Sequence, residues 1–263
     1  MGNDVEFQVD SLSEFLGYVQ DQKERHQEDF IFRGQRMDKP LLPRLARLEL
    51  PESKILNLEQ LIFEEFRRTC PSLTELAPAT DWDFLSLAQH HRLPTRLLDW
   101  TYSALAALWF AVEMRTRAVE IRPRKENGTL LNGVVWLLKT TKEDFIGEND
   151  RESPFQDGLT RIYRPRVINR WIAAQGGLFT VHRIIKNEGF VPFEKNRYFS
   201  GRRVKFVIKP QTFASLREQL HSCGVNRFSL FPDLEGLCSH LRWRYFERTA
   251  SSKTKADEKQ SRR

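Results

Sequence analysis

The sequence predicts a single α+β domain, built as a mixed sheet flanked by helices. Short apolar runs bounded by turn residues predict strands, and amphipathic stretches of about ten residues or more predict helices. Both kinds of segment occur along the chain, and no internal repeat divides it. The chain has 263 residues, of which 40% are hydrophobic, so one core can serve its whole length. We place this domain at residues 1–248.

The expected strands lie next to turn signals or polar residues. Phe30 to Phe32 predict a strand that ends at a loop formed by Arg33-Gly34-Gln35. A second strand is expected at Leu97-Leu98, directly after Pro94 interrupts a helical pattern. Further strands are expected at residues 133–139, 178–181 and 203–209.

Helical periodicity predicts seven helices. Ser11 is expected to cap the first helix and Asp81 the third. The helix over 103–117 is rich in Ala, Leu, Trp and Phe, so we expect it to be buried. The helices are expected at residues 11–20, 57–69, 81–91, 103–117, 166–174, 212–222 and 233–246.

Composition favours a cytoplasmic protein without a membrane segment. No run of 18 apolar residues occurs, and the N-terminus lacks the apolar core of a signal peptide. The three cysteines are too few and too scattered for a disulfide framework. The net charge is +7, and residues 249–263 supply +3 of it as a polar, charged tail that we expect to be disordered. This balance favours an anionic partner, with a nucleic acid as one option.

Polar residues are concentrated just before the most apolar helix. They comprise Gln89-His90-His91-Arg92, Thr95-Arg96 and Asp99-Trp100-Thr101. Such groups are costly to bury unless they bond one another or a ligand. The Arg96 guanidinium suits a carboxylate or a phosphate. The alternative is an internal ion pair of Arg96 with Asp99, with Thr101 as a helix cap.

Two glycine-containing segments are further candidates for ligand contact. Gly34 allows the backbone to approach a partner closely, although a turn glycine is the alternative. Gln175-Gly176-Gly177 enters a predicted strand, where the alternative is a helix C-cap followed by a turn. A phosphate-binding loop is excluded, because no Lys-Ser/Thr pair follows the glycines.

No metal site is expected. His221-x-Cys223 and Cys238-x-His240 have the residue types of zinc ligands. Both pairs lie in helical patterns, however, where residues two apart point in different directions. No Ser-His-Asp order and no Gly-x-Ser-x-Gly motif occurs, which argues against acyl transfer.

The chain resembles the FRG-domain family over roughly residues 12–245. Arg92 departs from the family pattern, in which a glycine is usual at this position. The resemblance rests on Phe32-Arg33-Gly34-Gln35, Asp81-Trp82-Asp83, the fifteen residues from Leu87 to Thr101, Ala107 to Ala111, Asn169-Arg170, Gln175 to Thr180, and Leu230 to Gly236.

A weaker resemblance reaches the ADP-ribosyltransferases, whose first core strand carries an arginine that grips NAD. It implies an enzyme that uses NAD as a substrate and modifies a macromolecule, as a toxin or phage-defence effector. Arg33 would then bind the diphosphate, Trp100 would stack on nicotinamide, and Asp99 would orient Arg96. The implied catalytic residues are His90, His91, Arg96 and Asp99, and the implied cofactor-binding residues are Arg33, Gly34, Gln35, Gln89, Trp100 and Gln175.

The motifs of the Arg-Ser-Glu class of these enzymes, Ser-Thr-Ser and Glu-x-Glu, are absent. The catalytic glutamate is therefore not assigned by motif, and Glu113, Glu188 and Glu194 are the candidates. The alternative function is a non-catalytic module that binds a nucleotide or nucleic-acid phosphate. A nuclease is a third option, which the lack of an evident Asp/Glu/Lys cluster disfavours. Whether the protein is an ADP-ribosyltransferase or a non-catalytic binding module, we expect its polar groups to converge on one pocket. That pocket is formed by Arg33, Gln89, His90, Arg96, Asp99 and Gln175.

Overall fold

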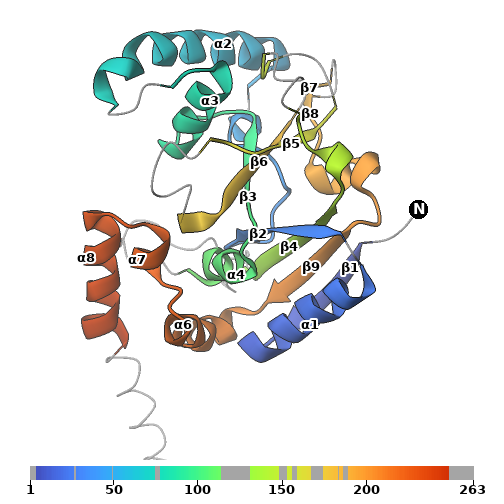
Figure 1. Ribbon diagram of the computed structural model, residues 1–263, viewed down its shortest axis with the longest axis vertical. Coiled ribbons are helices and arrows are strands. Elements are labelled where there is room, and N and C mark those ends of the chain that lie inside the picture. Colours follow the sequence, from blue (N-terminus) through green and yellow to red (C-terminus); the bar gives the residue numbers. More distant parts are fainter. Residues whose placement is uncertain are drawn as a thin grey trace, which may run out of the picture.

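The computed structural model confirms a mixed sheet flanked by helices (Figure 1). The expected 166–174 helix and the 249–263 tail lie largely or wholly outside the residues that the structure describes. Those residues are 4–26, 28–48, 50–74, 78–113, 131–147, 153–155, 159–166, 174–182, 184–185 and 189–248.

Seven strands form the main sheet in the order β1-β9-β4-β2-β3-β6-β5. The pair β1–β9 is parallel and the other pairs are antiparallel. A separate two-stranded ladder joins β7 (Ile184–Ile185) to β8 (Gly189–Phe190). The strands of the main sheet are β1 (Val5–Val9), β2 (Asp29–Gln35), β3 (Leu97–Thr101), β4 (Gly133–Thr140), β5 (Arg161–Tyr163), β6 (Gly177–Val181) and β9 (Arg203–Ile208).

The helices begin at polar caps. Ser11 caps α1 as predicted, by accepting a hydrogen bond from the Glu14 amide. Thr80, rather than Asp81, caps α3, and Ser103, rather than Thr101, caps α4. The described helices are α1 (Leu12–Arg25), α2 (Glu52–Thr69), α3 (Asp81–His90), α4 (Ala104–Val112), α6 (Phe213–Ser222), α7 (Arg227–Leu230) and α8 (Leu234–Arg242).

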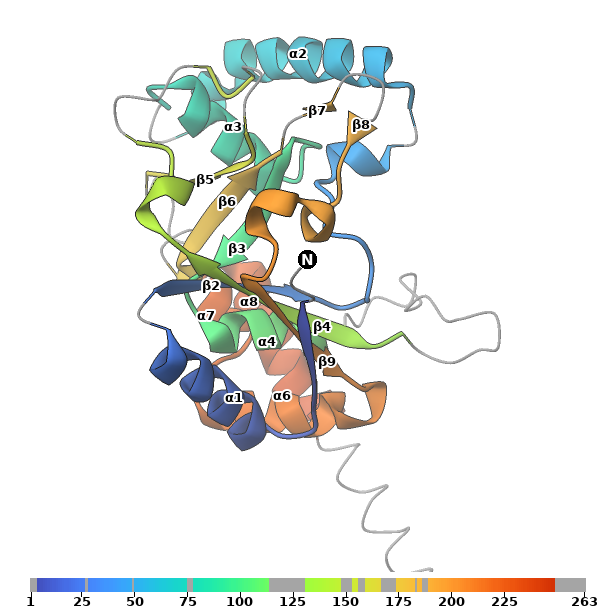
Figure 2. The same cartoon turned by 90° about the vertical axis from the view of Figure 1, so that its right-hand side faces the viewer.

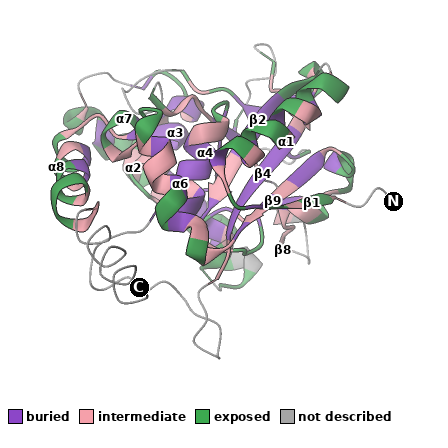
Figure 3. Ribbon diagram, turned by 90° about the horizontal axis from the view of Figure 1, so that it is seen from below, coloured by how far each residue is buried: buried purple, intermediate pink, exposed green. Residues whose placement is uncertain are grey.

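Two sets of helices cover different parts of the sheet (Figures 1 and 2). Helices α1, α4 and α6 pack with β2, β4 and β9 around Phe15, Trp109 and Phe206. Helices α2 and α3 pack with β3, β5 and β6 around Phe63 and Trp82. The strands β2 and β4 are therefore largely buried, as Figure 3 shows.

Two segments differ from the sequence-based prediction. Strand β1 was missed by the sequence-based prediction, although Val5–Val9 alternates apolar and polar residues as a half-buried strand does. It pairs with a strand almost 200 residues away. Arg33-Gly34-Gln35 continues strand β2 instead of forming a loop. The physical reason is that each of these residues has a partner in β4, from Trp136 to Val134.

The contact between β2 and β3 is short. Only one residue pair, Phe32 with Thr101, is in register between the two strands. On either side of this junction the pairing is longer, with seven pairs between β2 and β4 and five between β3 and β6. The main sheet thus consists of two well-paired parts that diverge beyond one shared position.

Gly34 allows α4 to lie directly against β2. A Cβ atom at this position would overlap the carbonyl oxygen of Ala107 and approach Phe110 to 2.9 Å. The close approach therefore requires glycine for packing, and it places α4 beside the diverging end of β2.

We predict that Gly34→Ala lowers the free energy of unfolding by about 3 kcal/mol or more, because backbone atoms must move to admit the methyl group. Gly17→Ala is the matched control, because Gly17 is exposed on α1 and nothing lies within 4 Å of an added Cβ. This control should gain about 0.5–1 kcal/mol from helix propensity. Chemical unfolding of both variants measures the difference, and equal effects would contradict the close packing.

Candidate functional site

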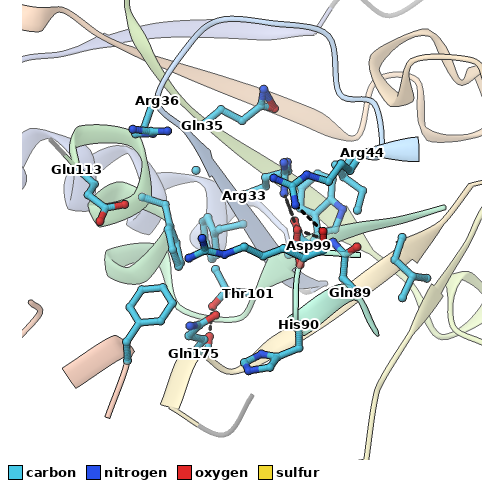
Figure 4. Close-up of a pocket in the computed structure, with 18 of the residues that line it drawn as sticks. Arg33, Gln35, Arg36, Arg44, Gln89, His90, Asp99, Thr101, Glu113 and Gln175 are labelled. Atoms are coloured by element: carbon cyan, nitrogen blue, oxygen red, sulfur yellow. Dashed lines mark hydrogen bonds and ion pairs between the residues drawn. The ribbon is translucent and has the colours of Figure 1, made fainter. Parts of the chain in front are cut away.

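A pocket of about 580 Å³ lies where β2 and β3 diverge (Figure 4). Its wall combines the end of β2, the segment that follows it to Arg47, the end of α3, and β3. Residues of α7 and α8 close the opposite side. Segments that are more than 200 residues apart in sequence thus share one cavity.

Arg33 spans the gap between the two strands. Its Nη1 donates a hydrogen bond of 2.7 Å to the backbone oxygen of Asp99 and lies 3.7 Å from the Asp99 carboxylate. Only 16% of the side chain is exposed, and burial lowers the pKa of Arg33 to about 10. The buried Nε of Arg33 has no hydrogen-bond partner among the described residues. The exposed 16% of the side chain lines the pocket, where it can meet a ligand.

Gln89 fixes the carboxylate of Asp99. Its Nε2 donates to Asp99 Oδ2 at 3.0 Å, and its Oε1 accepts from the Thr95 hydroxyl at 2.7 Å. The amide orientation follows, since the hydroxyl of Thr95 in turn accepts from the Leu97 amide. Gln89 and Asp99 both line the pocket, and Figure 4 shows them beside Arg33.

His90 faces the pocket in its neutral form. Burial lowers its pKa to about 4, and the charges of His91 and Arg92 add to this effect. A neutral imidazole can donate one hydrogen bond and accept another from a polar ligand. His91 is exposed and does not line the pocket, although its ring lies 5.0 Å from that of His90.

Two further arginines extend the basic side of the pocket. Arg44 donates to the backbone oxygen of Arg92 at 2.6 Å, and Arg47 donates to the backbone oxygens of Leu42 and Pro40. Burial and the charge of Arg44 lower the pKa of Arg47. Backbone carbonyls thus hold two guanidinium groups close together without neutralising them.

The other side of the pocket carries a buried carboxylate. Glu113 follows directly after α4, is 6% exposed, and forms an ion pair with Arg227 of α7. Arg227 also lies 4.0 Å from Glu235 and over the ring of Phe231 at 4.5 Å. Figure 4 shows Glu113 across the pocket from Asp99 and Gln89. The pocket therefore has a cationic side and a side with a buried glutamate.

Gln175 joins β3 to α7 at the pocket edge. Its backbone oxygen accepts from the Thr101 hydroxyl, and its Nε2 donates to the Leu230 backbone oxygen at 3.0 Å. Gln175 lines the pocket, as Gly34 and Gln35 do. Five residues of the predicted convergent set thus line one cavity, namely Arg33, Gln89, His90, Asp99 and Gln175.

Arg96, the sixth member, lies elsewhere. The prediction that it pairs with Asp99 is wrong, because its guanidinium forms a bidentate ion pair with Glu59 of α2 at 2.5–3.1 Å. Both side chains are at most 5% exposed, and Phe155 stacks against the guanidinium at 5.1 Å. Arg96 therefore joins α2 to the sheet, and it is absent from the pocket lining.

Trp100 is 3% exposed and its ring belongs to the core. Its Nε1 donates to the Thr180 hydroxyl at 3.0 Å, and its ring packs edge-on against Phe193. Trp100 is nevertheless among the residues that line the pocket. Asp99, whose side chain is 59% exposed, points to the opposite side of β3, as strand alternation requires.

Sequence reasoning missed Arg44, Arg47 and Arg227 as pocket residues. The basic stretch between Arg36 and Arg47 was the available signal for the first two. Of the candidate glutamates, Glu113 lines the pocket, Glu194 accepts from the Leu41 amide outside its lining, and Glu188 lies outside the described residues.

Among the described residues, no group of three or more His, Cys, Asp or Glu side chains is arranged to hold a metal ion. His221 and His240 do meet, with ring centroids 5.3 Å apart. The cysteines Cys70, Cys223 and Cys238 are free. No helix in the described ranges is both long and apolar enough to span a bilayer.

These features define an α+β domain with an arginine-lined pocket at the divergence of its sheet. Residues 28–119 match the family model of the FRG domain. The matched segment includes β2, α3, β3 and α4, and with them Arg33, Gln89, Asp99 and Glu113. Comparisons with curated proteins and with solved structures gave no match.

We predict that Glu59→Ala lowers the free energy of unfolding by about 3–5 kcal/mol, because it leaves the buried guanidinium of Arg96 unpaired. Asp99→Ala should cost far less, since that side chain is 59% exposed. Glu65→Ala is the matched control on α2, because its ion pair with Arg68 is exposed. If Asp99→Ala were the most damaging of the three in chemical denaturation, the assignment of the Arg96 partner would be wrong.

We also predict that stability falls in acid through His182. Burial lowers the pKa of this histidine to about 3, below the ordinary 6.5, so the folded state binds its proton less readily than the unfolded state does. Its contribution is complete above about pH 6.5 and is lost as the pH falls toward 3. Unfolding free energies between pH 7 and 4 measure this slope, and His182→Asn should flatten it. An unchanged slope in that variant would exclude His182 as its source.

Proposed function

We propose that the pocket binds NAD and that the protein transfers ADP-ribose from NAD to a macromolecule. The observation that carries this proposal is the arrangement around Arg33. Its buried guanidinium keeps an unpartnered Nε, and it shares one cavity with the buried carboxylate of Glu113. A cavity of about 580 Å³ is within the range that small-molecule ligands occupy.

The cationic side suits the pyrophosphate of a dinucleotide. Arg33 and Arg44 present planar guanidinium groups, which bind phosphate oxygens through paired hydrogen bonds. The partial burial of Arg33 strengthens such a bond, because water competes with it less than at an open surface. The neutral ring of His90 supplies a hydrogen bond to a ribose hydroxyl without adding charge.

The side of the pocket that carries Glu113 is suited to the part of NAD in which a bond breaks. In the proposed reaction, the bond between ribose C1′ and the nicotinamide nitrogen breaks and its electron pair leaves with neutral nicotinamide. Positive charge develops on the ribose, and the Glu113 carboxylate stabilises it. A nucleophilic atom of the acceptor then bonds to C1′ and loses its proton to solvent or a base.

The ADP-ribosyltransferase resemblance supports the same interpretation, and we propose that the protein acts in the cytoplasm as a toxin or phage-defence effector. The alternative is a module that binds a nucleotide or nucleic-acid phosphate without chemistry. It uses the same arginines but requires no carboxylate opposite them. The position of Glu113 in the same pocket favours the enzyme.

Nicotinamide release from NAD and calorimetric binding of NAD test the proposal together. Arg33→Ala should weaken NAD binding at least tenfold, because one charge-assisted phosphate contact is lost. Glu113→Gln should reduce release about 100-fold or more while binding changes little, because its carboxylate acts on the charge that develops during cleavage.

Glu194→Gln is the matched control, since this candidate glutamate does not line the pocket and release should persist. Circular dichroism of Glu113→Gln checks that loss of the Arg227 ion pair leaves the fold intact. Binding of NAD without release by the unmodified protein would establish the non-catalytic alternative. Absence of binding would exclude the proposed function.

A further inference from the structure

Arg92 has an unusual backbone conformation. Among the described residues it is the one non-glycine residue with a positive φ, which is 68°. The left-handed region strains an L side chain but is open to glycine without penalty. Strain that persists at a ligand pocket suggests that the side chain itself contributes to function.

The side chain of Arg92 adds to a cluster of like charges. It lines the same cavity as Arg33, Arg44 and Arg47, and its backbone oxygen accepts the hydrogen bond that holds Arg44. In the described part of the chain, the guanidinium of Arg92 has no carboxylate within salt-bridge distance. The carboxylates that act on this cluster are Asp99, near Arg33, and Glu194, near Arg47. The cluster therefore carries an excess of positive charge.

The positive charge of this cluster exceeds what is needed to neutralise a pyrophosphate. The diphosphate of NAD carries two negative charges, and Arg33 with Arg44 supplies two cations for it. Arg47 and Arg92 remain, and an ionised phosphate monoester brings close to two additional negative charges. Guanidinium forks also match the geometry of such a group better than an ammonium would.

We infer that Arg92, together with Arg47, forms a subsite for a phosphate monoester, so that the preferred dinucleotide is 2′-phosphorylated, as NADP is. This inference rests on the proposed function for the dinucleotide itself. The monoester subsite is a property of the cluster, and it can be tested with a mononucleotide. Arg92 is then a specificity-determining residue rather than a catalytic one.

The experiment compares adenosine 2′,5′-bisphosphate with adenosine 5′-monophosphate by calorimetry at one fixed ionic strength. The unmodified protein should bind the bisphosphate about tenfold more tightly or better, as expected for one additional charge-assisted contact. Arg92→Gly and Arg92→Ala should both reduce this ratio to about two or less. Arg36→Ala is the matched control, because Arg36 lies on the Glu113 side in Figure 4, and the ratio should persist.

The two Arg92 variants separate ligand contact from backbone strain. Both lack the guanidinium, but glycine alone relieves the left-handed conformation, so Arg92→Gly should melt at a higher temperature than Arg92→Ala. Equal loss of the ratio in both variants supports a side-chain role. A ratio that falls only in Arg92→Ala would assign the effect to the backbone and overturn the inference.

Failure of the inference is distinguishable from failure of the proposed function. If NAD is bound and cleaved but the bisphosphate binds no more tightly than the monophosphate, the subsite is excluded while the activity stands. If the bisphosphate preference depends on Arg92 but neither NAD nor NADP releases nicotinamide, the subsite stands and the transferase does not. Absence of binding by both mononucleotides also overturns the inference.

Discussion

One hydrogen bond, from the Arg33 guanidinium to the backbone oxygen of Asp99, bridges the gap between strands β2 and β3 that forms the pocket. Strands β2 and β3 share a single residue pair, so Asp99 has no strand partner in β2 for its carbonyl. Arg33 supplies a donor to this carbonyl through a side chain instead of a backbone amide. The strands can therefore separate while this carbonyl keeps a hydrogen-bond donor. The cost is a buried cation, and the same separation opens the pocket in which an anion can balance it.

Much of the fold was predictable because its signals are local. The Ser11 cap, the apolar run of Phe30 to Phe32 and the alternation of 203–209 each lie within one element. The alternation of Val5–Val9 is a local signal as well, but it was missed, and the parallel partner β9 lies too far along the chain for a local pattern to identify it. Contacts with distant elements also explain why Gly34 lies in a strand, because it pairs with β4 and packs against α4.

The site was predictable only where residues approach along neighbouring elements. The grouping of Gln89 with Asp99 follows from a short turn between α3 and β3. The partner of Arg96 could not be predicted in this way, because Glu59 lies 37 residues away on α2. The local sequence pattern does not specify where that helix packs. Alternation along β3 explains why the Asp99 side chain is 59% exposed whereas Trp100 is buried in the core.

The charges on the two sides of the pocket determine the orientation in which a charged ligand binds. Anionic groups are stabilised beside Arg33 and Arg47, whereas a cationic or developing positive centre is stabilised beside Glu113. In the ligand-free arrangement the charge of Glu113 is balanced by Arg227, so a cationic ring that enters there competes with this guanidinium. Arg227 has a second carboxylate at hand, because Glu235 lies 4.0 Å away. A small shift of Arg227 toward Glu235 would free Glu113 to pair with the cationic ring while Arg227 keeps a carboxylate partner, which is the electrostatic condition that the proposed cleavage requires.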